Sequence, residues 1–504
     1  MALPNIDRKA IASESIEAST KTTLGRIAHN SQPEKGLSGF RLMPLGTFSL
    51  DTRVQLAQRA EASLDVQYYQ LANDETGRWF LRALRDAANR GVRVRLLIDD
   101  LYTGGQDPLF LAFAATKNVE VRLFNPFCCA RQEGQTGRFL ASLGDLSRVN
   151  HRMHNKMFIA DGAMAVIGGR NVANEYYLRG PSENFIDLDA FVVGDVLPAM
   201  GALFDRYWNS RAVYPLKSIA KNPWSKSELL AYFEKETGPA KTPAPKPLAT
   251  TDVLGYAPIS DDLATGRLGL NWGTAYVFAD HPDKPFESSA GSDLLETSVT
   301  YNVLEAVAQA KHEVVASSPY FVPGVKGMAF LKKLRDRGVK VTVLTNSLGS
   351  TDEPIVHTGY SRYREQMLAE GIDLYELSST RVKYNKRPFL FGSSLGRLHA
   401  KLFVIDRKTS FIGSMNLDPR SATVNTEFGA VIESPEVARE IIRVIDIDRL
   451  QSAYKLRLAK NGSGIEWIGM DDDKEMVLTT EPDTSPWLRF KAWVLSPLVP
   501  EEQL

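Results

Sequence analysis

Two copies of one pattern of chemically active side chains occur in the chain. The first copy reads HNKMFIADGAMAVIGGRN from residue 154 to residue 171, and the second reads HAKLFVIDRKTSFIGSMN from residue 399 to residue 416. Both fit the pattern His-x-Lys, four residues, Asp, six residues, Gly-Gly or Gly-Ser, one residue, Asn. The chain has seven histidines, and two of them occupy equivalent places, so the pattern indicates a duplicated functional unit.

These residue types suit a phosphate group. Side chains at positions i and i+2 of a strand point to one face, so His154 and Lys156 share a face, as do His399 and Lys401. An ammonium group and an amide neutralise and orient phosphate oxygens, while an imidazole attacks phosphorus or moves protons. We therefore expect one catalytic set from both copies: His154, Lys156, Asn171, His399, Lys401 and Asn416.

Packing the two copies around a pseudo-two-fold axis would place one histidine on each side of a phosphorus atom. One histidine can then attack in line while the other protonates the leaving oxygen. The lysines already supply positive charge, so we expect no metal and no other cofactor. The glycine-containing turns at 168–169 and 413–414 precede the two asparagines, and backbone N–H groups there can also bind an anion.

A catalytic histidine benefits from a carboxylate on its second ring nitrogen. The strand after each motif offers a candidate, Asp187 in NFIDLDAFVVG and Glu427 in VNTEFGAVIES, with Asp189 as the alternative in the first half. One further aspartate lies at the hairpin turn of each motif, Asp161 or Asp406, an odd number of residues from the histidine, so we expect it to fix the turn or the lysine strand. The supporting set is Asp187, Glu427, Asp161, Asp406, Gly169 and Ser414.

A βαβ unit precedes each motif. SLDVQYY, GRWFLRALRDAANRG and VRVRLLIDD alternate as strand, helix and strand in the first half, and EVVASSPYF, GMAFLKKLRDRG and VKVTVLTNS do so in the second. Gly91 and Gly338 end the helices, and a third strand follows each unit, VEVRLFNP or IDLYEL. This order predicts an α/β fold of two duplicated domains, each with a mixed, mostly parallel β-sheet flanked by helices, packed with pseudo-two-fold symmetry.

Length and composition limit the classes of protein. Lys plus Arg and Asp plus Glu both number 60 in 504 residues, and a net charge of zero argues against a nucleic-acid partner. The apolar runs are too short for a polytopic membrane protein, and two adjacent cysteines, Cys128 and Cys129, exclude a disulfide framework. The repeat predicts an N-terminal extension (1–45), a first domain (46–215), a linker (216–255), a second domain (256–455) and a C-terminal hairpin with an amphipathic segment (456–504).

The motifs and their surroundings resemble the phospholipase D superfamily, and in particular the bacterial cardiolipin synthases of the C type. The resemblance covers residues 38–496 and includes SLDVQYY, GVRVRLLIDD, RMHNK, GGRN, SSPYFVP, HAKLFVID, FIGSMNLDPRS and NTE. It implies a phospholipid phosphatidyltransferase that forms a covalent phosphatidyl-histidine. By the same resemblance, His154 is the nucleophile and His399 protonates the leaving headgroup.

The resemblance also implies the partners. Phosphatidylglycerol is the acceptor, phosphatidylglycerol or phosphatidylethanolamine is the donor, and the protein is peripheral on a bacterial cell membrane. Basic and aromatic residues at 381–391 and 487–494 are candidates for membrane contact. The alternative function is hydrolysis by the same site, as in a phospholipase D that releases phosphatidic acid. A nuclease and a non-enzymatic scaffold are disfavoured by the zero net charge and by the two intact motifs.

Overall fold

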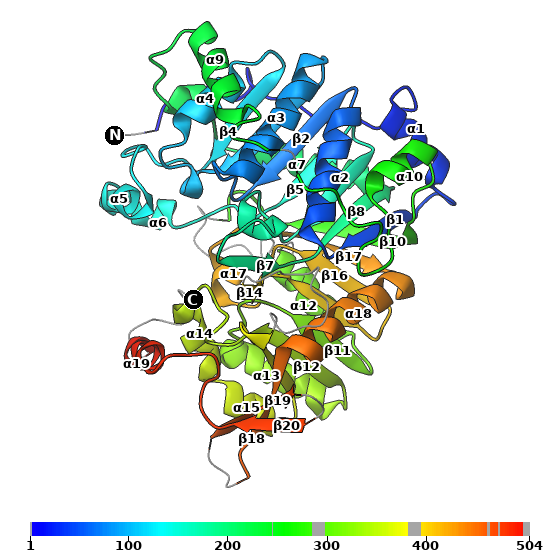
Figure 1. Cartoon of the computed structure of the whole chain (residues 1–504), viewed down its shortest axis with the longest axis vertical. Helices are drawn as coiled ribbons and strands as arrows, with labels where there is room; N and C mark the ends of the chain where they lie inside the picture. The colour runs from blue at the N-terminus through cyan, green and yellow to red at the C-terminus, as the bar shows by residue number, and fades with distance from the viewer. Residues whose placement is uncertain are drawn as a thin grey trace.

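The computed structural model describes residues 3–243, 245–284, 298–381, 395–460, 464–471 and 474–496. The first half of the chain forms the upper part of the molecule in Figure 1, and the second half forms the lower part. The first half contains β1 (Ser38–Met43), β2 (Ser63–Tyr68), β3 (Arg93–Asp99), β4 (Val119–Phe124), β5 (Met157–Ala160), β6 (Met164–Gly168), β7 (Glu183–Ile186), β8 (Asp189–Gly194) and β9 (Val213–Pro215). Its helices are α1 (Thr23–Ser31), α2 (Gly46–Arg59), α3 (Glu75–Asn89), η1 (Asp100–Tyr102), α4 (Asp107–Ala114), α5 (Gln135–Leu140), η2 (Leu143–Asp145), α6 (Leu146–Val149), η3 (Asn174–Tyr177) and α7 (Leu197–Trp208).

Three helices, α8 (Leu216–Ile219), α9 (Lys226–Thr237) and α10 (Ile259–Thr265), connect the halves. The strands that follow are β10 (Asn271–Ala279), β11 (Glu313–Ser317), β12 (Lys340–Asn346), β13 (Asp373–Leu377), β14 (Leu395–Leu398), β15 (Leu402–Ile405), β16 (Thr409–Gly413), β17 (Phe428–Glu433), β18 (Ala453–Leu458), β19 (Ile465–Asp471) and β20 (Lys474–Leu478). The helices are α12 (Val299–Ala308), α13 (Gly324–Asp336), α14 (Pro354–Ser361), α15 (Arg364–Ala369), α17 (Pro419–Thr423), α18 (Pro435–Ser452) and α19 (Pro486–Leu495).

The two halves have the same sheet topology. Neighbouring strands follow the order β1-β8-β6-β5-β2-β3-β4-β9 in the first half. The second half repeats it as β10-β17-β16-β15-β11-β12-β13-β18, and the β19–β20 hairpin extends that sheet. An antiparallel pairing of β1 with β10 joins the two sheets. The α/β class and the duplication that the sequence predicts are therefore confirmed.

The sheets are mixed, but they are mostly antiparallel, which corrects the expectation of mostly parallel strands. Within these two sheets, the described strands pair in parallel in β2–β3–β4 and β11–β12–β13, where a helix connects each strand to the next. The motif strands β5–β6 and β15–β16 are instead joined by tight turns at Asp161 and Asp406, which have positive φ angles of 52° and 49°. Short turns connect only antiparallel strands, so the duplicated motif makes this part of each sheet antiparallel.

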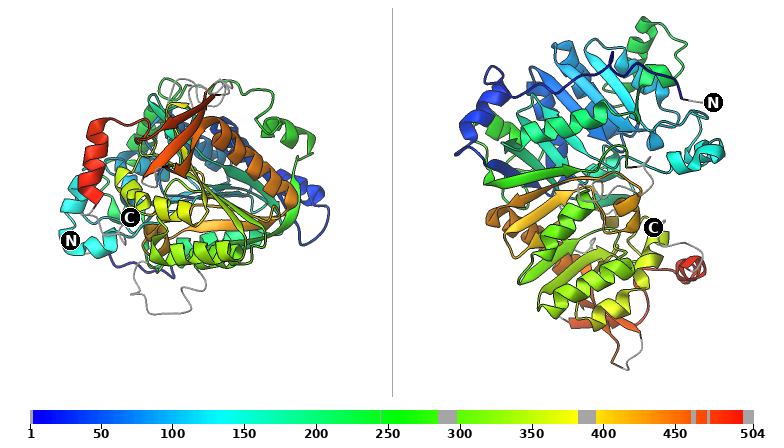
Figure 2. Two further views of the ribbon diagram at one scale, coloured as in Figure 1. Left: turned by 90° about the horizontal axis from the view of Figure 1, so that it is seen from below. Right: turned by 180° about the vertical axis from the view of Figure 1, so that it is seen from behind.

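Helices of each half pack against strands of the other half. Helix α7 lies on β10, and α18 lies on β1; the view from behind in Figure 2 shows the two halves stacked on each other. Phe204 and Trp208 of α7 share one buried apolar cluster with Ile441 and Ile445 of α18. Because this cluster takes residues from both halves, the interface that carries the motifs is part of the hydrophobic core.

The structure refines the domain division that the sequence predicts. Strand β1 lies within the stretch predicted as an N-terminal extension, yet it pairs with β8 of the first sheet. Helix α9 lies within the predicted linker and packs on α4, where the ring of Phe233 stacks on Phe113 at a centroid distance of 5.9 Å.

Within the described ranges, no helix combines the length and the apolar character needed to cross a bilayer.

Candidate active site

A parallel pairing between the halves brings His399 to Asp187. Strand β7 of the first half pairs with β14 of the second, with Ile186 opposite Leu398, and Figure 1 shows the two strands side by side between the halves. The backbone N–H of His399 donates to the carbonyl of Ile186 at 2.7 Å. Asp187 directly follows Ile186, and its Oδ2 lies 2.6 Å from His399 Nδ1.

An equivalent contact brings His154 to Glu427. Met153 and Thr426 form a parallel bridge, and the backbone N–H of His154 donates to the carbonyl of Thr426 at 2.8 Å. The following residue, Glu427, places Oε2 at 2.9 Å from His154 Nδ1. Each histidine therefore takes its carboxylate from the opposite half. Sequence reasoning named both carboxylates but assigned neither to a particular histidine, because the exchange depends on backbone pairing across the interface.

The two motif lysines are buried between these pairs. Lys156 Nζ donates to the carbonyl of His154 at 2.7 Å, and Lys401 Nζ donates to the carbonyl of His399 at 2.5 Å. Burial lowers the pKa of Lys401 to about 8 against the attraction of the nearby carboxylates, and it lowers the pKa of Lys156 well below its ordinary value. A bound phosphodiester anion would favour the charged ammonium form of both lysines, so the pocket favours an anionic ligand.

Burial also sets the charge of the histidines. It lowers the pKa of His154 to about 4 and of His399 to about 3, although the partner carboxylates oppose this shift. Burial opposes ionisation of Asp187 too, but His399 and Lys401 outweigh it and hold the Asp187 pKa at about 2. At neutral pH each neutral imidazole therefore donates its Nδ1–H to a carboxylate, which leaves Nε2 as the basic and nucleophilic nitrogen.

Gly169 and Ser414 occupy equivalent motif positions and support the two carboxylates differently. A Cβ atom at Gly169 would lie 2.3 Å from Asp187 Oδ1, so the absent side chain makes room for the aspartate. Ser414 Oγ instead donates to Glu427 Oε2 at 2.5 Å, and Ser421 Oγ donates to Glu427 Oε1 at 2.9 Å. Both residues thus act on the carboxylates, whereas the sequence indicated supporting residues in turns whose backbone N–H groups can bind an anion.

The two asparagines differ in their contacts. Asn171 Oδ1 accepts from the backbone N–H of Gln70 at 3.2 Å, and its Nδ2 donates to the hydroxyl of Tyr176 at 2.8 Å. Asn416 is also buried, but its Oδ1 has no hydrogen-bond partner among the described residues. A buried amide oxygen without a partner is costly, so Asn416 offers an acceptor to a donor group of a bound ligand, such as a hydroxyl.

Asp161 and Asp406 bind backbone amides rather than the histidines. Asp161 accepts from the N–H groups of residues 61, 62 and 63 at 2.8–3.1 Å. Asp406 accepts from those of residues 311, 312 and 313 at 2.8–2.9 Å. Each carboxylate therefore anchors the start of the neighbouring strand, β2 or β11, to the motif hairpin, in line with the turn-fixing role that the sequence predicts.

The last residue of β3 and of β12 holds the backbone directly before each motif histidine. Asp99 Oδ2 accepts from the N–H of Met153 at 2.8 Å. The amide of Asn346 both accepts from the N–H of Leu398 at 2.9 Å and donates to its carbonyl at 2.9 Å. The two residues occupy equivalent positions when the strand sequences VRLLIDD and VTVLTNS are aligned.

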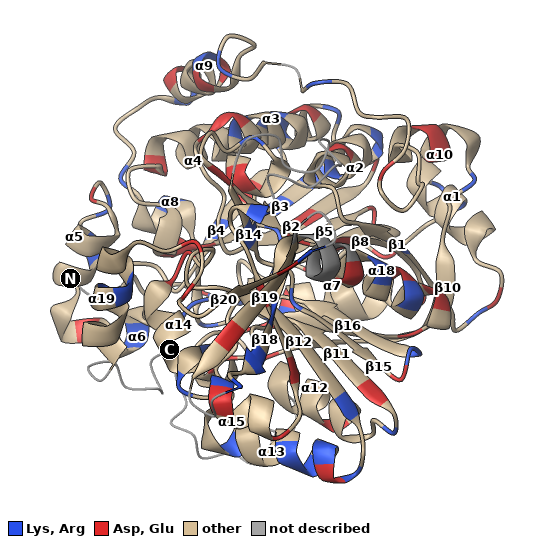
Figure 3. Ribbon diagram, turned by 60° about the horizontal axis from the view of Figure 1, so that its bottom comes forward, with Lys and Arg blue, Asp and Glu red and all other residues tan. Residues whose placement is uncertain are grey.

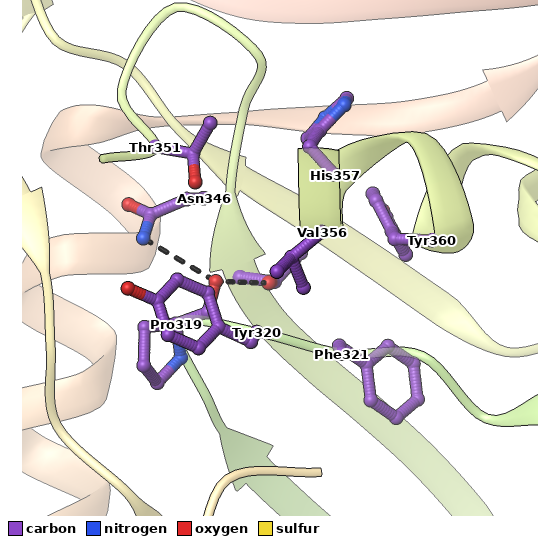
Figure 4. Close-up of a pocket in the computed structure, with 9 residues that line it drawn as sticks. Pro319, Tyr320, Phe321, Asn346, Thr351, Val356, His357 and Tyr360 are labelled. Carbon is purple, nitrogen blue, oxygen red and sulfur yellow. Dashed lines mark hydrogen bonds between the residues drawn. The ribbon is translucent and has the colours of Figure 1, made fainter. Parts of the chain in front are cut away.

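Figure 4 shows Asn346 beside a small cavity of about 10 Å³, where its amide also points at the carbonyl of Pro319. His357 lines the same cavity, and its Nε2 lies 2.7 Å from Arg364. His357, Glu376 and Glu481 are the one group in the described ranges with the spacing of metal ligands. Arg364 forms ion pairs with both glutamates, so a guanidinium already supplies the positive charge there.

Aromatic rings complete the surroundings of both histidines. Tyr69 packs edge-on against His154 with centroids 5.0 Å apart, and Lys156 Nζ lies 5.3 Å from the Tyr69 ring centroid. Tyr176 packs edge-on against His399 at 5.1 Å, and Phe185 contacts it at 5.0 Å. These rings restrict the orientation of each imidazole and keep water from its sides.

Two equivalent α/β halves, each of which supplies one histidine to a common site, define a phospholipase D-like protein with a site for phosphoryl transfer. The family model described as "Cardiolipin synthase, PLD-like domain" matches residues 54–194 and 303–448. The chain belongs to this family, which makes the protein an enzyme of the phosphatidyltransferase class.

Known proteins agree with this assignment. Cardiolipin synthase C of Escherichia coli (strain K12) is 37% identical over 461 residues, which cover 90% of this chain and 93% of the relative. A cardiolipin synthase of Staphylococcus aureus (strain Mu50 / ATCC 700699) is 24% identical over 86% of this chain and 72% of its own length. The crystal structure of phosphatidylserine synthase from Haemophilus influenzae Rd KW20 shares the fold, with a TM-score of 0.58 and 12% identity over 96% of this chain and 100% of that chain.

Proposed function

We propose that the protein synthesises cardiolipin by transferring a phosphatidyl group to phosphatidylglycerol. The observation that carries the proposal is the pair of buried imidazoles, each oriented by a carboxylate of the opposite half, with two lysine ammonium groups between them. The similarity to cardiolipin synthase C of Escherichia coli supports this choice of product. The donor is a second phosphatidylglycerol or a phosphatidylethanolamine, and no cofactor takes part.

In the first step, His154 Nε2 attacks the phosphorus of the donor lipid. A P–N bond forms while the P–O bond to glycerol or ethanolamine breaks, and His399 gives its Nε2 proton to the leaving oxygen. His399 must enter this step protonated. The charge of the bound phosphodiester and the carboxylate of Asp187 both favour the imidazolium, against the effect of burial. Lys156 and Lys401 neutralise the non-bridging oxygens.

In the second step, the terminal hydroxyl of phosphatidylglycerol attacks the phosphatidyl-histidine. His399, now neutral, accepts the hydroxyl proton while a new P–O bond forms and the P–N bond to His154 breaks. Cardiolipin leaves and both histidines return to their starting states. The orientation of these roles rests on the family resemblance and on Lys401 Nζ, which lies 3.1 Å from His399 Nδ1 and makes its imidazolium the stronger acid.

Purified protein incubated with vesicles tests the function directly. Vesicles of phosphatidylglycerol alone, and of phosphatidylglycerol with headgroup-labelled phosphatidylethanolamine, are analysed by lipid mass spectrometry. We expect cardiolipin and released glycerol or ethanolamine, and no product from the His154→Ala variant. Phosphatidic acid as the sole lipid product would instead show that water is the acceptor and that the protein is a hydrolytic phospholipase D.

Because its substrates are bilayer lipids, we also place the protein at the surface of a bacterial membrane as a peripheral enzyme. The membrane-contact candidates of the sequence divide into two groups. Residues 382–391 lie outside the described residues, whereas 487–494 form most of helix α19. Vesicle binding by the full chain checks this placement.

A further inference from the structure

Exposed apolar side chains gather in two patches. Among the described residues, seventeen large hydrophobic side chains are exposed, and seven of them lie in these two short stretches. The leucine patch consists of Leu140, Leu143 and Leu146, on α5, η2 and α6 of the first half. The aromatic patch consists of Trp487, Phe490, Trp493 and Val494, on α19 near the C-terminus. Such a concentration marks an interaction surface rather than scattered exposure.

Helix α19 has an unusual position for a helix of this composition. It runs over ten residues, none of which is buried, and Trp493 is 74% exposed. Its rings form a continuous ridge, with centroid distances of 5.6 Å from Trp487 to Phe490 and 6.2 Å from Phe490 to Trp493. A ten-residue helix gains little stability from hydrogen bonds alone, so the exposed aromatic face needs a partner surface.

Both patches are connected to the catalytic histidines through short chains of contacts. Gln135, the first residue of α5, acts on the hydroxyl of Tyr102 and opposes the rise in its pKa that burial causes. The Tyr102 ring packs on Tyr69 at 5.2 Å, and Tyr69 packs on His154 at 5.0 Å. Helix α5, which carries Leu140 of the leucine patch, therefore lies next to the aromatic residues that pack around His154.

The aromatic patch is connected to the other motif. Helix α19 packs on α14, and Arg362 after α14 donates to the carbonyl of Ser496. Helix α14 follows Asp352, whose Oδ2 accepts from the Tyr320 hydroxyl at 2.8 Å and whose charge acts on Lys401. Figures 1 and 3 both place α5, α6, α14 and α19 on the same flank of the molecule.

The charges of the aromatic patch fit an anionic surface. Residues 485–496 contain Arg489 and Lys491 and no acidic residue, and Arg362 lies exposed at the end of α14. Lys491 Nζ lies 5.6 Å from the Trp487 ring centroid. Tryptophan beside basic residues is the composition that places a helix at the boundary between lipid headgroups and acyl chains.

We propose that the leucine patch and the aromatic patch together form the surface that docks on an anionic phospholipid bilayer. The three leucines of the first half and the rings of α19 in the second half enter the boundary between headgroups and acyl chains. The flank that carries both patches, each connected by contacts to one of the two motifs, then faces the membrane. A lipid phosphodiester can reach His154 and His399 there while its acyl chains stay in the bilayer. This surface rests on the proposed function only for the identity of the substrate.

Vesicle binding tests the surface independently of catalysis. The Trp487→Ser/Trp493→Ser and Leu140→Ser/Leu143→Ser variants are compared with a control, Val325→Ser, which changes a 79% exposed residue of α13 outside both patches. In flotation with vesicles of phosphatidylcholine and phosphatidylglycerol, we expect each patch variant to bind about tenfold or more weakly than the wild type. The control should bind as the wild type does, and circular dichroism confirms that all variants are folded.

Two further readouts keep the outcomes separate. For the patch variants, the ratio of transferase activity on vesicles to activity on dispersed short-chain lipid should fall about tenfold. Unchanged vesicle binding by both patch variants would overturn the proposal, as would a wild-type dimer that the α19 variant abolishes, because the patch would then bind a second copy. A wild type that binds vesicles but makes no cardiolipin leaves the docking surface standing and refutes only the proposed function.

Discussion

Parallel backbone pairing positions both histidine–carboxylate pairs, but different residues hold the two carboxylates. Glu427 accepts hydrogen bonds from the hydroxyls of Ser414 and Ser421 as well as from His154. These hydroxyls share the charge of the carboxylate, so Glu427 mainly orients the imidazole. This arrangement suits a histidine that must present a neutral Nε2 to phosphorus.

In the second pair the carboxylate has a shorter side chain and lies beside a glycine rather than beside a serine hydroxyl. Asp187 lies against the bare backbone of Gly169, accepts from His399 at 2.6 Å and keeps a pKa of about 2. Lys401 lies 3.1 Å from the same imidazole nitrogen. A fully ionised carboxylate stabilises an imidazolium, while the lysine promotes loss of its proton, which suits a histidine that cycles between acid and base.

In both halves the carboxylate comes from the opposite half, whereas the residues that support it differ between the halves. In each pair, the segment directly before the histidine pairs in parallel with the segment directly before the carboxylate. This backbone pairing fixes the two side chains relative to each other. The residues that tune each carboxylate, Gly169 and Ser414, come from one motif position. Function could therefore diverge between the halves without changing the backbone that brings them together.

Removal of either histidine should have the largest effect. We expect His154→Ala and His399→Ala each to lower the transferase rate by about 10⁴-fold or more, because neither the nucleophile nor the proton donor has a substitute. The rate is measured as cardiolipin formed on phosphatidylglycerol vesicles. A loss confined to one variant would break the assumption that both pairs take part in one reaction.

Neutral replacements of the carboxylates should have the next largest effect. Asp187→Asn and Glu427→Gln keep the shape but remove the charge that orients the imidazole, and we expect losses of about 10²–10⁴-fold. If the pairs differ as described, Asp187→Asn should also shift the pH profile of kcat more than Glu427→Gln does. Equal shifts in the two profiles would argue against different roles for the two histidines.

Exchange of the supporting residues should separate the pairs further. Gly169→Ala places a Cβ at 2.3 Å from Asp187 Oδ1, and we expect about a 10²-fold loss of rate because the carboxylate must move. Ser414→Ala removes one hydroxyl contact to Glu427 and should lower the rate about tenfold, equivalent to about 1.4 kcal/mol. Thermal melting of both variants serves as the control for folding, and a larger loss for Ser414→Ala would reverse the comparison.

Acid should destabilise the protein through the same histidines. Their folded pKa values, about 4 and about 3, lie below the ordinary value of 6.5, so the unfolded chain binds more protons over this range. Stability that is complete above pH 6.5 is then lost as the pH falls towards 4 and 3. The Tm of a His154→Gln/His399→Gln variant should fall less than that of the wild type between pH 6.5 and 4, whereas parallel curves would contradict the assigned direction.

The sequence predicted the residues that meet at the candidate site and part of their geometry. Constant motif spacing identified His154 and His399, and the strands after the motifs supplied Asp187 and Glu427. It could not reveal that the pairs cross between halves, because β7 and β14 meet only through the packing of the two domains.

Asp99 and Asn346 escaped notice for a related reason. They differ in type, and their common task is visible only in their bonds to the backbone before each histidine. Strands β1 and β10 were also missed, since they join the sheets outside the repeated βαβ units. Long-range backbone pairing thus accounts for what the sequence did not predict.

Trapping the covalent intermediate tests the division of roles most directly. Protein mixed with phosphatidylglycerol vesicles is quenched within the first turnover, digested under conditions that preserve phosphohistidine bonds, and analysed by mass spectrometry. We predict a phosphatidyl adduct on His154 and none on His399. An adduct on His399, or on neither histidine while cardiolipin is still formed, would contradict the assignment of His154 as the nucleophile.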